Sequence, residues 1–288
     1  MKKTIKCILM AVVVVMVCSV GIETSRVSAA GMKSICPEKA GKRKTIKADI
    51  DGDGIQNKIS VHYTCDNYDF TKKIYVEIDG SSALELDVSK YNAFGCHLNV
   101  VESNSRDKCI HLYSYTDNDY IVFSEIYKYN KQSKKLFKVL DLLSQGDNST
   151  IVKATKNGFI TKNRTQPSEI GWISWKFTYV WKNGKPVLKT NTVPPTSTIM
   201  RKFTTGKTLK FSREAGGKEA AFILKRGKKV SLINIKVTKK KMYVQFQYGK
   251  KKGWLCVGQE KYEKIYQFDK EGNLISSYFE GVHERLAG

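Results

Sequence analysis

Segments in which apolar and polar residues alternate follow one another through most of the chain, and this pattern constrains its fold more than any other feature. Ile74, Val76 and Ile78, for example, alternate with more polar neighbours. A β-strand points successive side chains to opposite faces, so a period of two predicts strands with one buried face. The same alternation recurs at residues 59–63, 84–88, 97–101, 110–114 and 121–129. We therefore expect an all-β protein.

The segments between residues 46 and 192 predict an N-terminal antiparallel β-domain, built either like propeller blades or as a sandwich. Its last long strand, at residues 172–181, is aromatic and ends at Asn183-Gly184. This dipeptide closes tight hairpins because both of its residues adopt positive φ. Only residues 136–144 have an ambiguous period, and a short helix is the less favoured interpretation there.

A change in composition separates this domain from a second one. Residues 193–200 contain Pro194-Pro195 followed by Thr196-Ser197-Thr198, which favours a solvated linker. Five short strands are expected in residues 201–258, and a sheet this short needs closure to hide its edges, which predicts a small SH3-like barrel. These strands are expected at residues 208–211, 222–225, 229–237, 242–248 and 253–257. Residues 259–288 would form a C-terminal extension.

The first 30 residues have the form of a secretory signal peptide. Lys2, Lys3 and Lys6 precede a nearly continuous apolar run at residues 8–20, and small residues follow at Val27-Ser28-Ala29-Ala30. The apolar run is shorter than the roughly 18–20 residues needed to span a bilayer. We therefore expect a mature protein without a transmembrane segment, secreted or associated with the cell wall. Residues 31–45 lack a period and are interpreted as a flexible lead-in.

The charge of the chain points to an anionic partner. The sequence has 50 Lys and Arg against 27 Asp and Glu, a net charge of +23. Residues 201–257 alone contain 17 basic and 2 acidic residues. A field this one-sided attracts polyanions. Nucleic acid is disfavoured, because the signal peptide directs the chain outward and no recognition helix is evident.

An acidic loop is the first candidate site. Asp49, Asp51 and Asp53 place three carboxylates within five residues, with glycines between them that let the backbone curl. By analogy with EF-hand loops, the calcium ligands would be these three side chains, the carbonyl of Ile55 and the side chain of Asn57. Ser60 stands where an EF-hand has its closing glutamate, so the loop is not a full EF-hand. The alternative is a metal-free turn rich in aspartate.

The form D-x-D-G-D-G-x-x-N-K-I, from Asp49 to Ile59, resembles the calcium loop of FG-GAP/VCBS-type repeats, the blade units of integrin-like propellers. The resemblance implies a structural calcium ion. Asn57 replaces an acidic residue of that pattern, which implies a weaker site.

The C-terminal segment resembles the bacterial SH3 (SH3b) domain. The resemblance is carried by a Lys-Arg-Gly turn at Gly227 and by the Gly253-Trp254 pair after a lysine run. It implies binding to peptidoglycan peptides or other extracellular ligands. Aromatic and basic residues near the rim of such a barrel are the candidate ligand-binding residues, namely Tyr243, Tyr248, Lys251 and Trp254. The alternative is that these aromatics belong to the core and the lysines to a solvated surface.

The sequence gives no sign of catalysis. It contains no C-x-x-C, G-x-S-x-G or H-E-x-x-H motif and no phosphate-binding glycine loop. The cysteines beyond the signal peptide are Cys36, Cys65, Cys96, Cys109 and Cys256, and disulfides are permitted outside the cell, with the pairing open. We therefore expect a secreted, non-catalytic, cell-wall-associated binding protein with a structural calcium loop. The alternatives are a wall hydrolase or its accessory, and an extracellular protein-interaction module.

Overall fold

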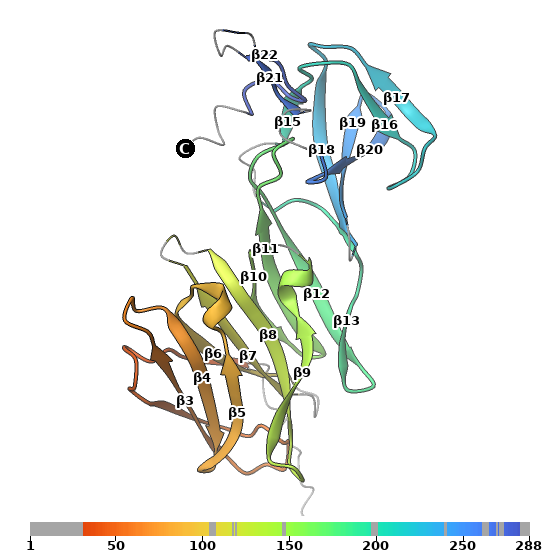
Figure 1. Cartoon of the computed structure of the whole chain (residues 1–288). Coiled ribbons are helices and arrows are strands. Elements are labelled where there is room, and N and C mark those ends of the chain that lie inside the picture. The colour runs from red at the N-terminus through yellow and green to blue at the C-terminus, as the bar shows by residue number, and fades with distance from the viewer. Residues whose placement is uncertain are drawn as a thin grey trace, which may run out of the picture.

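The computed structural model describes residues 31–103, 108–116, 118, 120–145, 148–196, 201–238, 241–260, 265–268, 270 and 274–282. The expected signal peptide lies outside these residues. The elements in the described part are antiparallel strands, apart from two short 3₁₀ helices, η1 (Ser89–Tyr91) and η2 (Leu142–Gln145) (Figure 1). The all-β class is therefore confirmed. None of the helices described is long and apolar enough to cross a membrane.

Three antiparallel sheets form the N-terminal part of the molecule. The first follows chain order and contains β2 (Lys44–Ala48), β3 (Asn57–Cys65), β4 (Thr71–Ile78) and β5 (Ser81–Asp87). The second has the order β1 (Gly31–Ile35), β6 (Phe94–Glu102), β7 (Lys108–Tyr115), β8 (Ile121–Asn130) and β9 (Lys135–Asp141). The third contains β10 (Asn148–Thr155), β11 (Gly158–Thr165), β12 (Ile173–Lys182) and β13 (Lys185–Leu188).

The second sheet is buried on both faces. Leu98 and Val100 belong to the hydrophobic core that it shares with the first sheet. Val101 and Cys109 belong to the core that it shares with the third sheet. Neighbouring residues of one strand point to opposite faces, so the pair Val100-Val101 reaches both cores. The three sheets therefore form a stack in which the second is the middle layer.

The interpretation of residues 31–45 as a flexible lead-in is wrong. Gly31–Ile35 forms β1, which pairs with β6 at the edge of the second sheet, and Ile35 lies opposite Leu98. Residues 44–48 form β2, paired with β3. The segment looks irregular in sequence because β1 is an edge strand that is mostly exposed, and exposed strands do not need an apolar period.

The C-terminal sheet contains β14 (Thr192–Val193), β15 (Lys202–Thr204), β16 (Leu209–Ser212), β17 (Ala220–Leu224), β18 (Lys229–Val237), β19 (Met242–Tyr248) and β20 (Lys251–Val257). Its order is β14-β18-β19-β20-β16-β17, and β15 also pairs with β18. The strands expected at residues 229–237 and 242–248 are present with those bounds.

The expected barrel is not closed by strand pairing among the described residues. The C-terminal extension packs at the open side instead. The Gly206 N–H donates to the Tyr278 carbonyl at 2.9 Å, and the Glu280 N–H donates to the Thr204 carbonyl at 2.9 Å. Between them Phe279 is buried, with its ring centroid 5.1 Å from that of Phe246. The extension thus completes the core of this sheet. Before that contact it forms a short hairpin of β21 (Gln267–Phe268) and β22 (Leu274–Ser276).

The segment expected to be a solvated linker is ordered where it is described. Val193 pairs with Ile235 in β18, and Pro195 is buried in a bridge to Trp175 of the third sheet. The Thr196 N–H donates to the Ser174 carbonyl at 2.8 Å. Residues 197–200 lie outside the described part. One continuous hydrophobic core connects the third sheet to the C-terminal sheet, so the buried Pro195 sits at a packed junction, whereas Pro194 is exposed.

Candidate functional site

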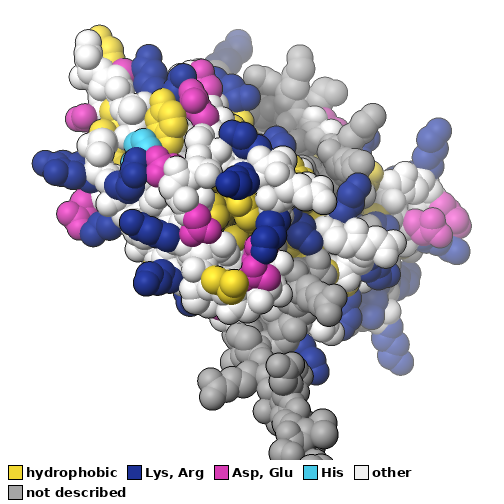
Figure 2. Space-filling view, turned by 90° about the horizontal axis from the view of Figure 1, so that it is seen from below, with side chains coloured by type: hydrophobic (Ala, Val, Ile, Leu, Met, Phe, Trp, Pro, Cys, Tyr) yellow, Lys and Arg dark blue, Asp and Glu magenta, His cyan; other side chains and the backbone are white. Residues whose placement is uncertain are grey.

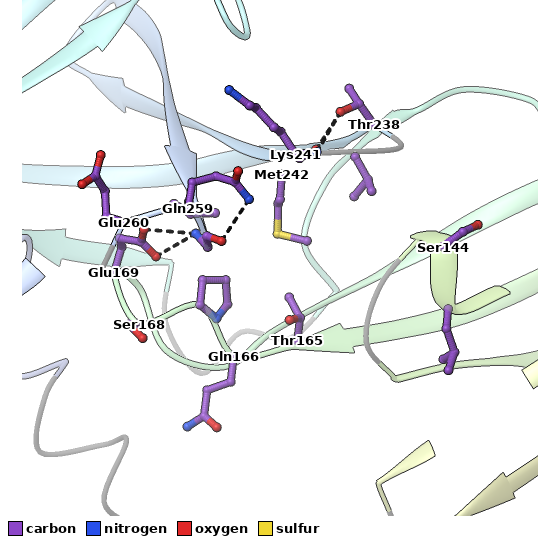
Figure 3. Close-up of a pocket in the computed structure, with 15 residues that line it drawn as sticks. Ser144, Thr165, Gln166, Ser168, Glu169, Thr238, Lys241, Met242, Gln259 and Glu260 are labelled. Atoms are coloured by element: carbon purple, nitrogen blue, oxygen red, sulfur yellow. Dashed lines mark hydrogen bonds between the residues drawn. The ribbon is translucent and has the colours of Figure 1, made fainter. Parts of the chain in front are cut away.

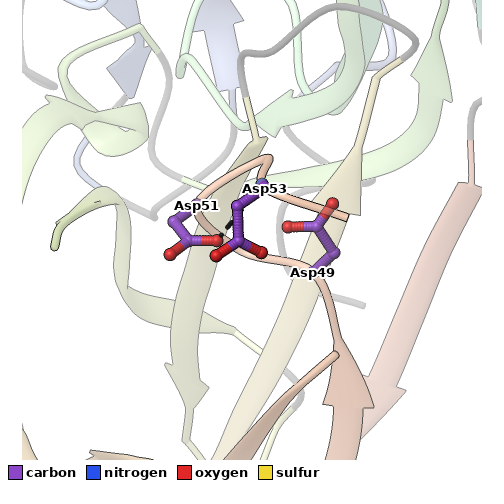
Figure 4. Close-up of side chains that lie close together, drawn as sticks. All are labelled: Asp49, Asp51 and Asp53. Atoms are coloured by element: carbon purple, nitrogen blue, oxygen red, sulfur yellow. Dashed lines mark hydrogen bonds between the residues drawn. The ribbon is translucent and has the colours of Figure 1, made fainter. Parts of the chain in front are cut away.

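The acidic loop lies between β2 and β3 and brings its three aspartates together. One carboxylate oxygen from each of Asp49, Asp51 and Asp53 lies within 4.8 Å of the others (Figure 4). Hydrogen bonds from backbone N–H groups of the loop to the Asp49 carboxylate hold this shape. Asp49 accepts hydrogen bonds from the N–H groups of Gly52 at 2.7 Å and Gly54 at 3.1 Å. Both glycines have positive φ, of 80° and 89°, a conformation that costs glycine little.

Two lysines of the second sheet form ion pairs with this cluster and offset most of its charge. Lys108 Nζ lies 2.5 Å from Asp49 Oδ2, and Lys131 Nζ lies 3.0 Å from Asp51 Oδ2 and 2.5 Å from Asp53 Oδ2. The hydrogen bond from Lys131 lowers the pKa of Asp53. Burial acts to raise the pKa of Asp49, but the bonds from Lys108 and from the loop N–H groups outweigh it and lower the pKa. The chain thus supplies cations where a metal ion was expected.

Of the other two predicted ligands, Ile55 would use its backbone carbonyl, and its side chain is exposed. The Asn57 side-chain amide is engaged in other hydrogen bonds. Asn57 Oδ1 accepts from the Ile50 N–H at 3.0 Å, and its Nδ2 donates to Asp79 Oδ2 at 2.8 Å. The three carboxylates suit a hard divalent cation, whereas Asn57 holds the end of the loop against the β4–β5 turn.

A second candidate site is a cavity of about 210 Å³ on the C-terminal sheet. It is lined by Tyr243 from β19, by Trp254 and Cys256 from β20, and by Lys241 just before β19. The turn at residues 213–219 forms its other wall. Tyr243 and Trp254 are half-buried, and Lys241 is exposed. Burial raises the pKa of the Cys256 thiol, against the opposing effect of Lys241.

The strand register explains this juxtaposition. Tyr243 lies opposite Cys256, and Gln245 lies opposite Trp254, so Tyr243 and Trp254 are diagonal neighbours on one face. Val244 and Phe246 point to the other face and are buried in the core.

The facing turn comes close because it carries glycine at its apex. Gly216 has φ +85°, and a Cβ placed on it would lie 2.9 Å from Tyr243 Oη. A larger residue at this position would collide with the tyrosine and would also be strained.

The structure brings together two of the four predicted ligand-binding residues. Tyr243 and Trp254 line the cavity. Tyr248 and Lys251 pair with each other at the far end of the β19–β20 hairpin, where Tyr248 lies near Phe222. Lys241, which lies beside them, was not one of the four predicted residues. Lys241 could have been predicted from its position two residues before Tyr243, because residues i and i+2 of an extended chain share a face.

A larger cavity, of about 360 Å³, lies between the third sheet and the C-terminal sheet (Figure 3). Glu169 points its buried carboxylate at the backbone after β20, and its two oxygens accept from the Gly258 N–H at 3.0 and 2.9 Å. Burial raises the pKa of Glu169, and the bonds from backbone N–H groups oppose that rise. The Tyr266 hydroxyl donates to the Ser168 carbonyl beside it. These hydrogen bonds at the wall of the cavity connect the third sheet to the C-terminal sheet and its extension.

A hydrogen-bonded chain of Asn99, His111 and Ser124 crosses the middle sheet. His111 Nδ1 lies 3.2 Å from Asn99 Nδ2, and its Nε2 lies 2.9 Å from Ser124 Oγ. The residue types match those of a nucleophilic relay. The His111 side chain is completely buried and Ser124 is 1% exposed, so the hydroxyl lies in the interior, away from solvent. Burial lowers the pKa of His111 to about 3, which keeps the ring neutral.

No family model matches the chain, and neither a curated protein nor a solved structure matches it. Its function is therefore inferred from the geometry of these sites.

Proposed function

We propose that the protein is a secreted, non-catalytic binding protein that associates with the bacterial cell wall through its C-terminal sheet. The observation that carries this proposal is the cavity in which Lys241, Tyr243 and Trp254 meet. The ligand class that fits it is an anionic wall component with an apolar part, such as a carboxylate-bearing wall peptide. The resemblance to SH3b domains supports the same assignment.

The charge distribution supports an anionic ligand. Residues 201–257 carry 17 basic and 2 acidic residues, a net charge of +15 within the segment that contains this sheet. The opposite end of the molecule is different, because acidic side chains are interspersed among the basic ones there (Figure 2). Charges of one sign add up over a surface and steer a polyanion toward it, whereas mixed charges cancel. Wall association would thus occur through the C-terminal sheet.

Tyr243 and Trp254 add apolar contact area, which charged groups alone do not provide. Tyrosine and tryptophan present large apolar faces at a low cost in conformational entropy, which makes them frequent anchors in binding sites. Strand pairing holds the Tyr243 backbone and the Gly216 turn lies close to its hydroxyl, and together they limit the movement of the ring. A preorganised aromatic wall beside an exposed lysine favours a ligand with a carboxylate next to an apolar group.

We further propose that the acidic loop binds calcium as a structural ion, held by Asp49, Asp51 and Asp53. The convergence of three carboxylates supports this. Calcium would have to replace Lys131, whose side chain is 64% exposed and free to swing into solvent. Lys108 is more deeply placed and would remain with Asp49. Because calcium must compete with Lys131 for the carboxylates, its binding should be weak, in the millimolar range of extracellular modules.

The experiment is co-sedimentation of the chain from Gly31 onward with purified wall sacculi across a salt series. Binding at low salt that weakens as salt rises supports the proposal, because screening shortens the reach of exposed charges to about 10 Å at 0.1 M. No sedimentation at low salt would contradict it and favour the alternative of a protein-interaction module. A cleared band on wall material in a zymogram would contradict the non-catalytic assignment.

A further inference from the structure

Three cysteines lie around one tyrosine where the first two sheets meet. Cys65 is the last residue of β3, Cys96 lies within β6, and Cys36 directly follows β1. Tyr63, two residues before Cys65, is buried in the core that these sheets share. We call Cys36, Cys65 and Cys96 the thiol trio. All three are free thiols in this structure.

Contacts between the sheets bring Cys65 close to Cys96. Cys65 pairs with Thr71 across β3 and β4, and Thr71 is bonded to the start of β6. The Thr71 N–H donates to the Ala93 carbonyl at 2.7 Å, and its hydroxyl donates to the Gly95 carbonyl at 3.3 Å. Gly95 is the residue before Cys96. Cys65 also packs against the hydrophobic cluster that contains Cys96.

The edge strand brings Cys36 to the same place. Ile35 lies opposite Leu98 in the antiparallel pair of β1 and β6, so the next residue, Cys36, continues alongside the segment that contains Cys96. The loop after Cys36 then folds onto the end of β3, where the Gly41 N–H donates to the Tyr63 carbonyl at 2.8 Å. Burial raises the pKa of Tyr63 to about 12, and the charges of all three cysteines add to that rise.

The remaining two described cysteines are placed elsewhere. Cys109 belongs to the core on the opposite face of the second sheet, and Cys256 lines the cavity of the C-terminal sheet. They are therefore natural controls. Within the trio the three thiols differ in access, because Cys36 is exposed, Cys65 is half-buried and Cys96 is fully buried.

We propose that the thiol trio is an oxidisable centre that closes one disulfide between Cys36 and either Cys65 or Cys96 when the protein meets a small-molecule disulfide. The exposed Cys36 thiolate attacks the oxidant RS–SR, which forms a mixed disulfide and releases one RS⁻. A second thiolate of the trio then attacks the Cys36 sulfur, which forms the protein disulfide and releases the second RS⁻. Two protein thiols and one RS–SR thus become one protein disulfide and two RSH.

The bond would fasten β1, an edge strand held on one side only, to the body of the molecule. A cross-link restricts the unfolded chain, so oxidation should raise the melting temperature by several degrees. This chemistry does not depend on wall binding, and either proposal can fail without the other.

The test is disulfide mapping of the chain from Gly31 onward after incubation with oxidised glutathione. After alkylation under denaturing conditions and digestion, mass spectrometry should find one disulfide that joins the Cys36 peptide to the Cys65 or the Cys96 peptide, with Cys109 and Cys256 alkylated. Alkylation of all five cysteines would overturn the proposal. So would a linkage that includes Cys109 or Cys256, or one that joins two chains.

Variants identify the role of Cys36. Because its side chain is exposed, Cys36→Ser should fold normally, and it should form the disulfide at least tenfold more slowly or not at all. Cys256→Ser is the matched control and should oxidise like the wild type. Equal oxidation rates for Cys36→Ser and wild type would overturn the assignment of Cys36 as the thiol that is attacked first.

Discussion

The ammonium group of Lys131 lies 2.5 Å from the Asp53 carboxylate, so an amine from the β8–β9 turn pairs with a loop that was expected to need a metal ion. The hydrogen bonds to Asp53 and Asp51 raise the pKa of Lys131. These residues are 78 positions apart in the sequence, and the bond joins the first sheet to the second. Calcium would therefore bind this loop only by displacing Lys131 from the two carboxylates.

Removing two carboxylates should abolish the response to calcium. The wild type is expected to melt at a higher temperature in millimolar calcium, because an ion that binds only the folded state stabilises it. The double variant Asp51→Ala/Asp53→Ala leaves too few ligands and should show no calcium-dependent change. Differential scanning fluorimetry measures both. A wild type that is unaffected by millimolar calcium would sink the metal proposal.

Removing the competing amine should have the opposite effect. Lys131→Gln takes a cation away from Asp51 and Asp53, so the calcium affinity should increase by about tenfold or more, measured by calorimetric titration. Lys135→Gln is a control on the same hairpin, because Lys135 bonds to the Ser82 carbonyl and not to the acidic loop. Equal calcium affinities of Lys131→Gln and the control would show that Lys131 does not compete with the ion.

The buried His111 should make the protein less stable in mild acid. Its pKa is about 3 in the folded chain, against an ordinary value of 6.5. Below pH 6.5 the unfolded chain binds a proton that the folded chain does not, so the free energy of unfolding should fall by up to about 1.4 kcal/mol per pH unit. His97, whose pKa is also lowered by burial, adds a slope of the same sign.

Urea unfolding at pH 7 and pH 5 measures this slope. The carboxylates with lowered pKa, such as Asp49, lose their contribution only below about pH 4, so they do not affect this window. His111→Gln should lose most of the difference between the two pH values, whatever its stability at pH 7. An unchanged difference in this variant would rule out His111 as the cause.

Glu169 should be important for the junction between the third and C-terminal sheets. Glu169→Ala removes the buried carboxylate that accepts from the Gly258 N–H, and hydrogen bonds to charged groups contribute about 1.5–3 kcal/mol to the free energy of unfolding. Glu169→Gln keeps one oxygen acceptor and should lose less. Denaturant titration compares the two. If Glu169→Ala were as stable as the wild type, Glu169 would not contribute to the stability of this junction.

The sequence predicts the parts of this fold that depend on local pattern. The strands at 229–237 and 242–248 and the positive φ of Asn183 and Gly184 follow from alternation and from turn chemistry. The sequence pattern fails where distant segments decide the outcome. Gly31–Ile35 is a strand only because β6 offers it a partner, and Pro195 is buried where it forms an antiparallel bridge with Trp175 of the third sheet.

The same distinction holds for the candidate sites. The convergence of Asp49, Asp51 and Asp53 follows from local spacing and could be predicted. The lysines that neutralise them come from other strands and could not. In the C-terminal sheet, Tyr243 and Trp254 were both identified by residue type, but only the strand register separates them from Tyr248, which lies outside the cavity.

The most direct test of the central claim compares how two variants, Trp254→Ala and Tyr248→Ala, bind to wall sacculi. Trp254→Ala removes an aromatic wall of the cavity, and Tyr248→Ala removes an exposed aromatic of the same hairpin that lies outside it. In co-sedimentation at low salt, Trp254→Ala should raise the dissociation constant by about tenfold, equivalent to about 1.4 kcal/mol, while Tyr248→Ala should match the wild type. Equal binding by all three proteins would contradict the account.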